Sequence, residues 1–299
     1  MKRKILDANF LSQLENMSLY LKNPMDGYFG GTRKSNTYGS TVDFADFREY
    51  MPGDDLRRID WNVYGRFEKF YIKLFLDERQ MHTQIFLDCS ESMAWGQPEK
   101  AELMLKYAAA FGFLSVQALD KVSYMRMSEG DCMDLCGTVS GKDSFYMAMD
   151  KLSTVKFEGE TDMEAAIKQC VNPGYSDGIT IIISDFFTES NWKKAVDYLI
   201  YKKRQVVLLQ ILSPDEISPD FGGRLNLIDS ESILEGDLRN TKMEINKSAV
   251  KAYKIALNDY QKEMETFCNS RNATFLTVST DASIEEMLYK KGYEKELIR

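Results

Sequence analysis

The sequence of 299 residues is poor in the side chains that bind zinc or copper. It has one histidine, His82, and five cysteines at scattered positions. An odd number of scattered cysteines favours thiols in a reducing compartment over a disulfide framework. Cys132 and Cys136 have no second pair at zinc-site spacing, so we interpret them as buried thiols.

The sequence also contains no segment of the kind that crosses a membrane. No stretch approaches the roughly 18 to 20 apolar residues that a transmembrane helix needs, and no apolar core follows the basic N-terminus. With 38 basic and 46 acidic residues, the net charge of -8 argues against binding to nucleic acids or anionic membranes. We therefore expect a cytoplasmic protein with no membrane span and no nucleic-acid partner.

What the chain does contain is an alternation of apolar strands and amphipathic helices after residue 80. The expected strands lie at 83–87, 122–127, 179–183, 206–212 and 273–278, and the expected helices at 100–119, 143–152, 161–171, 191–203 and 247–270. This alternation predicts an α/β fold with a parallel sheet and helices on both faces. We expect a small hairpin at 225–238, and we expect Lys100 and Lys106 to lie on solvated helix faces.

The first 80 residues have a different character. Their pattern predicts a helix at 7–21, a glycine-rich loop or hairpin at 27–40, a turn at Met51–Asp54 and a strand at 70–75. We therefore divide the chain into residues 1–80, a helix plus a β-rich segment, and residues 81–299, the α/β domain.

Oxygen-bearing side chains follow two of the expected strands. Asp88 directly follows the strand at 83–87, and Ser90 and Ser92 come shortly after it. Thr161 opens a helix, and Asp185 follows the most apolar strand. In an open parallel sheet, ligands bind at the carboxyl ends of the strands, so these side chains are expected to meet there. An all-oxygen set suits Mg²⁺ or Mn²⁺, whereas the Asp-x-Ser-x-Ser triplet alone is equally compatible with helix capping.

Three aromatic residues flank the same loops. Trp95, Phe186 and Phe187 are candidates for an apolar rim that excludes water around a partner contact. The alternative is core packing, which we prefer for Phe186 and leave open for Trp95.

The Asp-x-Ser-x-Ser loop, the downstream threonine and the strand-end aspartate resemble the metal-ion-dependent adhesion site of von Willebrand factor A-type domains. The resemblance covers residues 80–285 and implies that Ser90, Ser92 and Thr161 are metal ligands. It further implies that Asp88 and Asp185 bind the metal directly or accept hydrogen bonds from its ligands. One coordination position would be left for an acidic residue of a protein partner.

The N-terminal segment is similar to the signature of the DUF fifty-eight family, a prokaryotic domain-of-unknown-function family that joins such a segment to an A-type domain. The residues that carry this likeness include Arg48, Tyr50, Pro52, Gly53, Asp54, Asp55, Arg57, Asp60, Trp61 and Arg66. The resemblance implies an adaptor or chaperone-like partner of a MoxR-type AAA+ ATPase. The chain has no Gly-x-x-x-x-Gly-Lys-Ser/Thr, so we expect ATP hydrolysis to come from the other protein.

The combined expectation is a non-enzymatic interaction module whose bound metal holds an Asp or Glu of the ATPase or of its client. A Mg²⁺-dependent phosphatase is one alternative, but it needs a second aspartate where this chain has Ser90. A structural A-type domain without metal is the other. We expect the charged signature residues to form an internal ion-pair network that ties the small β-rich segment to the sheet, with a docking surface for the ATPase as the alternative. These residues are Arg48, Asp54, Asp55, Arg57, Asp60 and Arg66.

Overall fold

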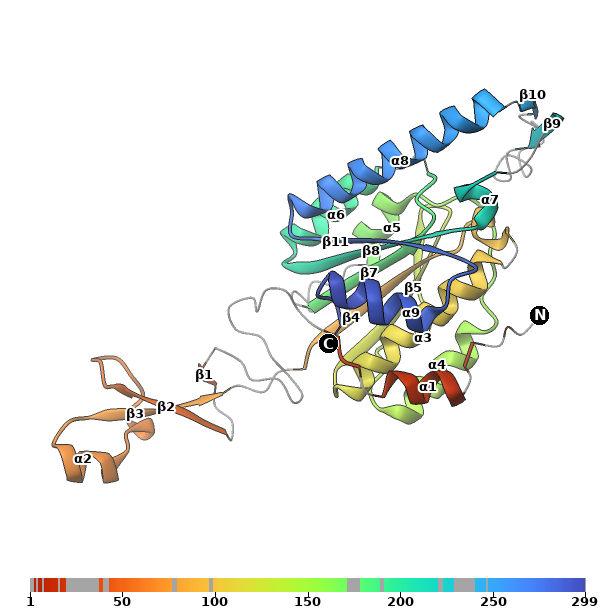
Figure 1. Cartoon of the computed structure of the whole chain (residues 1–299). Coiled ribbons are helices and arrows are strands. Elements are labelled where there is room, and N and C mark those ends of the chain that lie inside the picture. The colour runs from red at the N-terminus through yellow and green to blue at the C-terminus, as the bar shows by residue number, and fades with distance from the viewer. Residues whose placement is uncertain are drawn as a thin grey trace.

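The computed structural model describes residues 3, 5–6, 8–15, 17–19, 38–39, 43–76, 80–96, 99–170, 178–188, 191–219, 223–228, 240–245 and 247–298. Its centre is a six-stranded sheet (Figure 1). The strands follow one another across the sheet as β6 (Asp131–Asp134), β5 (Lys121–Ser128), β4 (His82–Asp88), β7 (Gly178–Ser184), β8 (Arg204–Leu212) and β11 (Thr274–Ser279).

All neighbours in this sheet run parallel except β6, which pairs antiparallel with β5. From β4 the chain adds strands first on one side and then, starting with β7, on the other. This is the doubly wound strand order, and its topological switch point lies between β4 and β7. The predicted von Willebrand A-type fold, a mostly parallel sheet flanked by helices, is therefore confirmed.

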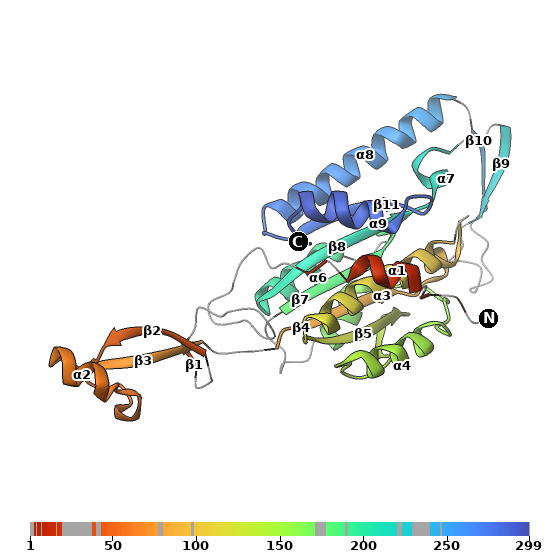
Figure 2. The same cartoon turned by 60° about the horizontal axis from the view of Figure 1, so that its bottom comes forward.

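Helices cover both faces of the sheet, as Figures 1 and 2 show. One face packs against α1 (Ala8–Leu14), α3 (Lys100–Gln117), α4 (Lys142–Leu152) and α9 (Ile284–Met287). The other packs against α5 (Met163–Cys170), α6 (Trp192–Tyr201) and α8 (Lys247–Asn269). Successive strand residues point to opposite faces, so Ile181 and Ile183 of β7 join the first core and Ile182 the second. Burial on both faces explains the uninterrupted apolar runs in the sequence.

Helix α3 approaches the sheet closely through Gly112. A Cβ atom at this position would lie 1.7 Å from Oη of Tyr124 on β5. A larger residue at this position would require the hydroxyl of Tyr124 to move, so the glycine lets α3 lie close to the sheet at this point.

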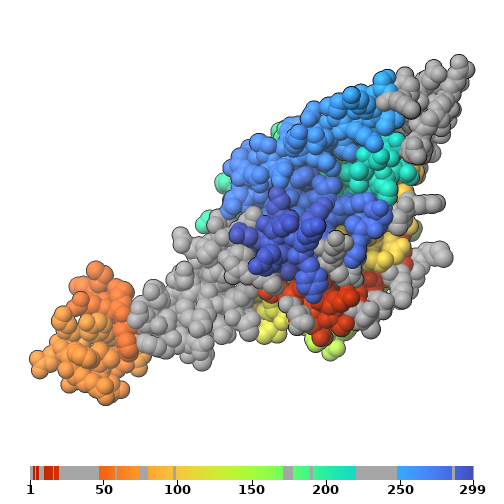
Figure 3. Space-filling view, in the orientation of Figure 1, coloured from red at the N-terminus to blue at the C-terminus, as the bar shows by residue number. Residues whose placement is uncertain are grey.

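A second, three-stranded antiparallel sheet has the order β1 (Tyr38–Gly39), β3 (Tyr71–Leu76) and β2 (Asp43–Glu49). The short helix α2 (Trp61–Phe67) lies between β2 and β3 in the chain. Ile59 and Ile72 are the core of this small sheet among its described side chains. In Figure 3 this part of the chain, in orange, forms a lobe apart from α1 and α8.

The ion pairs of the signature segment were expected to tie it to the main sheet, but among the described residues they lie inside this lobe. Arg48 pairs with Asp54 at 2.7 Å, and Lys73 pairs with Asp60 at 3.0 Å. No ion pair in the described part of the chain joins the lobe to the six-stranded sheet. Helix α1 packs against the main core instead of the lobe, while the boundary at residue 80 stays a prediction.

Several elements differ from the sequence-based expectation. Strand β6, the short helix α7 (Pro214–Ile217) and the C-terminal turns after residue 283 were not predicted. The expected hairpin is present as β9 (Gly223–Ile228) and β10 (Asn240–Ile245), with its second strand later than predicted. The glycine-rich stretch at 27–37 lies outside the described residues.

The cysteine prediction is wrong for one pair. Cys132 on β6 and Cys170 at the end of α5 form a disulfide, with their Cα atoms 5.8 Å apart. The fold places α5 against β6, which the separation of 38 residues in sequence does not reveal. Cys89, Cys136 and Cys268 are free thiols.

Within the described residues, none of the helices combines the length and the apolar character needed to cross a bilayer.

Candidate functional site

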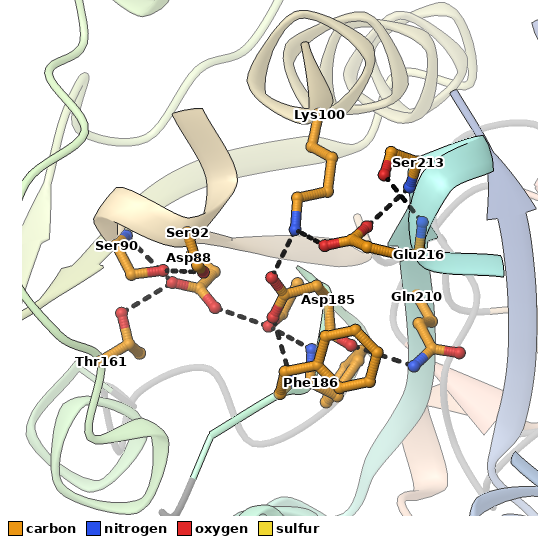
Figure 4. A network of polar contacts seen from close by, with 12 residues as sticks. Asp88, Ser90, Ser92, Lys100, Thr161, Asp185, Phe186, Gln210, Ser213 and Glu216 are labelled. Atoms are coloured by element: carbon orange, nitrogen blue, oxygen red, sulfur yellow. Dashed lines mark hydrogen bonds and ion pairs between the residues drawn. The ribbon is translucent and has the colours of Figure 1, made fainter. Parts of the chain in front are cut away.

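The candidate site lies at the switch point of the main sheet. Strands β4 and β7 are parallel neighbours, with Leu87 paired to Ile183. The chain leaves these strands at Asp88 and at Ser184–Asp185, so both turns begin at the same edge of the sheet. Figure 4 shows the side chains that meet there.

Asp88 is the centre of this group and is 2% exposed. Its Oδ1 accepts hydrogen bonds from the hydroxyl of Thr161 at 2.7 Å and from the backbone N–H of Ser90 at 3.1 Å. Its Oδ2 accepts one from the hydroxyl of Ser184 at 2.5 Å. Among the described residues no cation pairs with this carboxylate.

Burial raises the pKa of Asp88 above its ordinary value, and the nearby carboxylate of Asp185 adds to the increase. The hydrogen bonds from Ser184, Thr161 and Ser90 act in the opposite direction but do not compensate. Charge on Asp88 is therefore disfavoured in the protein alone, and a bound cation would stabilise it.

The two serines lie on the short 3-10 turn Glu91–Ala94 and just before it. Ser90 occupies the N-cap position, but its side chain makes no capping hydrogen bond. Its hydroxyl instead lies 3.0 Å from the hydroxyl of Ser92. The capping alternative, which concerned Asp88 and Ser92, is met in part, because Asp88 accepts the backbone N–H of Ser90. It does not account for the hydroxyl of Ser90, which faces a second hydroxyl beside Asp88.

Asp185 is engaged on both carboxylate oxygens. Its Oδ2 accepts a hydrogen bond from Nζ of Lys100 at 2.7 Å, and its Oδ1 accepts one from the backbone N–H of Phe187 at 3.0 Å. The backbone carbonyl of Asp185 accepts from Nε2 of Gln210 at 3.0 Å. These contacts fix the turn after β7.

Lys100, the first residue of α3, is 1% exposed, so its placement on a solvated face was predicted wrongly. Its ammonium also donates to Oε1 of Glu216 at 2.6 Å. Burial opposes its charged form, but the carboxylates of Asp185 and Glu216 outweigh this effect and raise the pKa of Lys100. Glu216 in turn forms a capping box with Ser213 at the start of α7.

The structure thus brings together four of the predicted residues, Asp88, Ser90, Ser92 and Thr161, and places Asp185 beside them. Sequence analysis missed Ser184, whose only signal was its position directly before Asp185. It also missed the role of Lys100, because the first turn of an amphipathic helix gives no sign of burial.

The donor chemistry of this group fits a hard cation. Its atoms are hydroxyl and carboxylate oxygens, the ligands that Mg²⁺ and Mn²⁺ prefer. The described residues contain no cluster of three or more His, Cys, Asp or Glu side chains arranged for a metal. A cation at this edge would therefore be held mainly by hydroxyls, with Asp88 as the charged ligand.

The three flanking aromatic residues differ in exposure. Trp95 and Phe187 are 48% and 40% exposed, so both are available to a partner. Phe186 is 1% exposed, and Tyr260 donates a hydrogen bond to its carbonyl at 2.8 Å. The side chain of Phe186 packs in the core and does not contribute to an exposed rim.

Curated relatives of the chain have no assigned function. The uncharacterized proteins Rv1480 of Mycobacterium tuberculosis and Mb1516 of Mycobacterium bovis are each 26% identical over 231 residues, which is 76% of this chain and 72% of theirs.

Solved structures give more distant matches. BatB of Bacteroides thetaiotaomicron matches at 15% identity and a TM-score of 0.44, over 72% of this chain and 98% of that one. The SpRpn10 VWA domain matches at 10% identity and a TM-score of 0.40, over 71% and 95%.

The family comparison is more extensive. Residues 46–260, which include most of the small lobe, the candidate site and most of α8, match one family. Since this is more than half of the sequence, the chain belongs to the family described as "Protein of unknown function DUF58".

Proposed function

We propose that this chain is a non-enzymatic protein-interaction module that binds a divalent cation and through it an acidic residue of a partner. One observation carries the proposal. Asp88 is a buried carboxylate that, among the described residues, receives hydrogen bonds only from neutral groups, and it lies at the switch point, where doubly wound sheets bind ligands.

The proposed ligands are Asp88, Ser90, Ser92 and Thr161, with Asp185 beside them. Neutral hydroxyls leave a bound cation with more net positive charge than a cage of carboxylates would. When bound, Mg²⁺ or Mn²⁺ would supply an electrophilic site for a carboxylate of the partner. Trp95 and Phe187 are exposed next to this position and would shield the contact from water.

The proposed partner is a MoxR-type AAA+ ATPase or its client, and the proposed location is the cytoplasm. Both rest on the family resemblance and on the composition of the chain. The disulfide between Cys132 and Cys170 is an observation against a reducing compartment. The oxidation state of these cysteines in freshly lysed cells would decide the location.

A structural domain without metal is the second candidate, and the ammonium of Lys100 favours it. This internal cation already neutralises Asp185 at 2.7 Å, so part of the site's charge is balanced within the chain. A phosphatase has less support, because Ser90 stands where the second aspartate is needed as general acid and base.

The test is the Asp88→Ala substitution. Isothermal titration with Mg²⁺ and Mn²⁺ should show saturable binding to the wild type and a loss of more than about 100-fold in the variant, because a direct ligand matters at least as much as the groups that orient ligands. Ser90→Ala should weaken binding in the same direction.

The matched control is Asp143→Ala, which removes an exposed carboxylate from the first turn of α4. It should leave metal binding and partner capture unchanged. Affinity capture of the partner should depend on the metal and be abolished by chelator. If the Asp88→Ala protein captures the partner at full strength, the metal-bridge mechanism is wrong.

A further inference from the structure

The buried ammonium of Lys100 forms the only ion pairs in the described part of the site. Its Nζ lies 2.7 Å from Oδ2 of Asp185 and 2.6 Å from Oε1 of Glu216. The side chains of Lys100 and Asp185 are 1% and 3% exposed. Breaking a buried ion pair is strongly destabilising, because it leaves a charge without a partner away from water. The ammonium is therefore a fixed part of the site.

The arrangement divides the acidic groups of the site into two classes. Asp185 and Glu216 share the ammonium, whereas Asp88 accepts hydrogen bonds from Thr161, Ser184 and a backbone N–H. Of these three carboxylates, Asp88 is therefore the one that has no cation paired with it among the described residues.

Figure 4 shows how this division is built. Lys100 reaches down from α3 and enters between Asp185 and Glu216, while the hydroxyls of Ser90 and Thr161 lie on the other side of Asp88 and Ser92 lies next to Ser90. Lys100 is the first residue of α3, a helix that packs in the main core. A divalent cation held by Asp88 and the hydroxyls would thus have a permanent positive charge as its neighbour.

We propose that Lys100 sets the charge of the cation site: by neutralising Asp185 it lowers the affinity for divalent cations and leaves a bound cation with excess positive charge for the partner's carboxylate. This inference rests on the proposed metal-dependent function. Its physical basis is Coulomb repulsion between the ammonium and the cation, which are separated by one side chain in a site removed from bulk water.

The experiment is a calorimetric titration of the full chain with Mg²⁺ and with Mn²⁺. Lys100→Met keeps the length of the side chain and removes its charge, so it should tighten cation binding by about tenfold or more. Lys106→Met is the matched control on the same helix, because Lys106 pairs with Glu102 at the surface. It should leave the affinity unchanged. Unchanged or weaker binding by folded Lys100→Met would overturn the proposal.

A double variant separates charge from ligation. Lys100→Met combined with Asp185→Asn removes both members of the pair and returns the net charge of the site to its original value. The cation affinity should then return to within about threefold of the wild type. A large further loss would show that Asp185 is itself a ligand whose charge Lys100 does not cancel, which contradicts the proposal.

Loss of the ammonium leaves the buried Asp185 and the partly buried Glu216 without a paired cation, so the stability of Lys100→Met is measured by thermal unfolding with and without metal. Metal should raise the melting temperature of this variant more than that of the wild type. If the variant is unfolded without metal, addition of metal should restore a cooperative unfolding transition. No stabilisation by metal would count against the role of Lys100.

The outcomes also distinguish this proposal from the proposed function. Saturable binding that Asp88→Ala abolishes and Lys100→Met leaves unchanged supports the metal site and refutes the role of Lys100. Binding by Lys100→Met but not by the wild type supports the role of Lys100 and refutes the metal-dependent function of the native chain. Absence of binding in both refutes the two together.

Discussion

His82 is the one histidine of the chain, and its ring is buried at the start of β4, where Nε2 lies 2.8 Å from the hydroxyl of Ser123. Burial lowers the pKa of His82 from 6.5 to about 3, and the charges of Arg204 and Lys121 contribute. The folded protein keeps the ring neutral, whereas the unfolded chain takes up a proton below pH 6.5. Stability is therefore unaffected by His82 above this pH and falls as the pH decreases from 6.5 toward 3, by up to about 1.4 kcal/mol per pH unit.

Urea unfolding of the wild type and of His82→Gln between about pH 7.5 and pH 5.5 measures this effect. The stability advantage of the wild type over the variant should shrink by about 1 kcal/mol as the pH falls through this range. The raised pKa of Asp88 has the opposite effect on stability, but it is common to both proteins and cancels in the difference. Parallel pH profiles of the two proteins would show that His82 accepts a proton in the fold.

The candidate site shows which residues a sequence can reveal. Asp88, Ser90 and Ser92 follow an apolar strand at fixed spacing, but this triplet alone is equally compatible with helix capping. It became a candidate site only together with Thr161 and with Asp185, which follows a second apolar strand. Lys100 was not predictable, because its burial depends on the approach of α3 to the sheet and on two carboxylates from β7 and α7. The contact of Ser184 with Asp88 was not predictable either, because a serine at the end of a strand has no sequence feature that marks it as part of a site.

At the scale of elements, the disulfide links the edge strand β6 to the end of α5. Cross-linking residues 38 positions apart restricts the unfolded chain, which corresponds to a stabilisation of roughly 2–4 kcal/mol. Reduction should therefore lower the free energy of unfolding by this amount. Guanidinium melts with and without dithiothreitol provide the measurement.

The control is Cys132→Ala combined with Cys170→Ala, which should be destabilised to a similar extent and should no longer respond to the reductant. Thiol labelling under denaturing, non-reducing conditions should modify Cys89, Cys136 and Cys268 only. Modification of all five cysteines would mean that the protein in solution carries thiols at 132 and 170.

The elements that were predicted from the sequence are those with the longest apolar runs or the longest helical patterns. β4, β7 and β8 are buried on both faces and read as apolar runs, and α3 and α8 are long. Strand β6 escaped prediction because most of its residues are exposed and it pairs only with β5 at the edge of the sheet. Helix α7 has four residues, which are too few to show the 3.6-residue periodicity of a helix in the sequence.

At the scale of the whole molecule, the chain has cores of very different size. The six-stranded sheet is covered on both faces, whereas the described side chains of the small lobe bury Ile59 and Ile72 with support from Tyr50. On the lobe, Trp61 is 64% exposed and contacts Tyr64 and Phe70 edge-on. The strand and helix pattern predicted the large sheet, but it contained no information on whether the lobe shares a core with it.

Two tryptophans report on the two cores separately, because Trp61 belongs to α2 of the lobe and Trp192, which is 5% exposed, belongs to α6. We consider two variants, one that keeps only Trp61 and one that keeps only Trp192, with the remaining tryptophans replaced by Phe. The fluorescence of Trp61 should change at a lower urea concentration than the fluorescence of Trp192. The Trp61 transition should also have the smaller dependence on urea, because the lobe exposes less surface when it unfolds. Coincident transitions would show that lobe and main sheet unfold as one cooperative unit, and the lobe would then have to be stabilised by contacts with the main sheet.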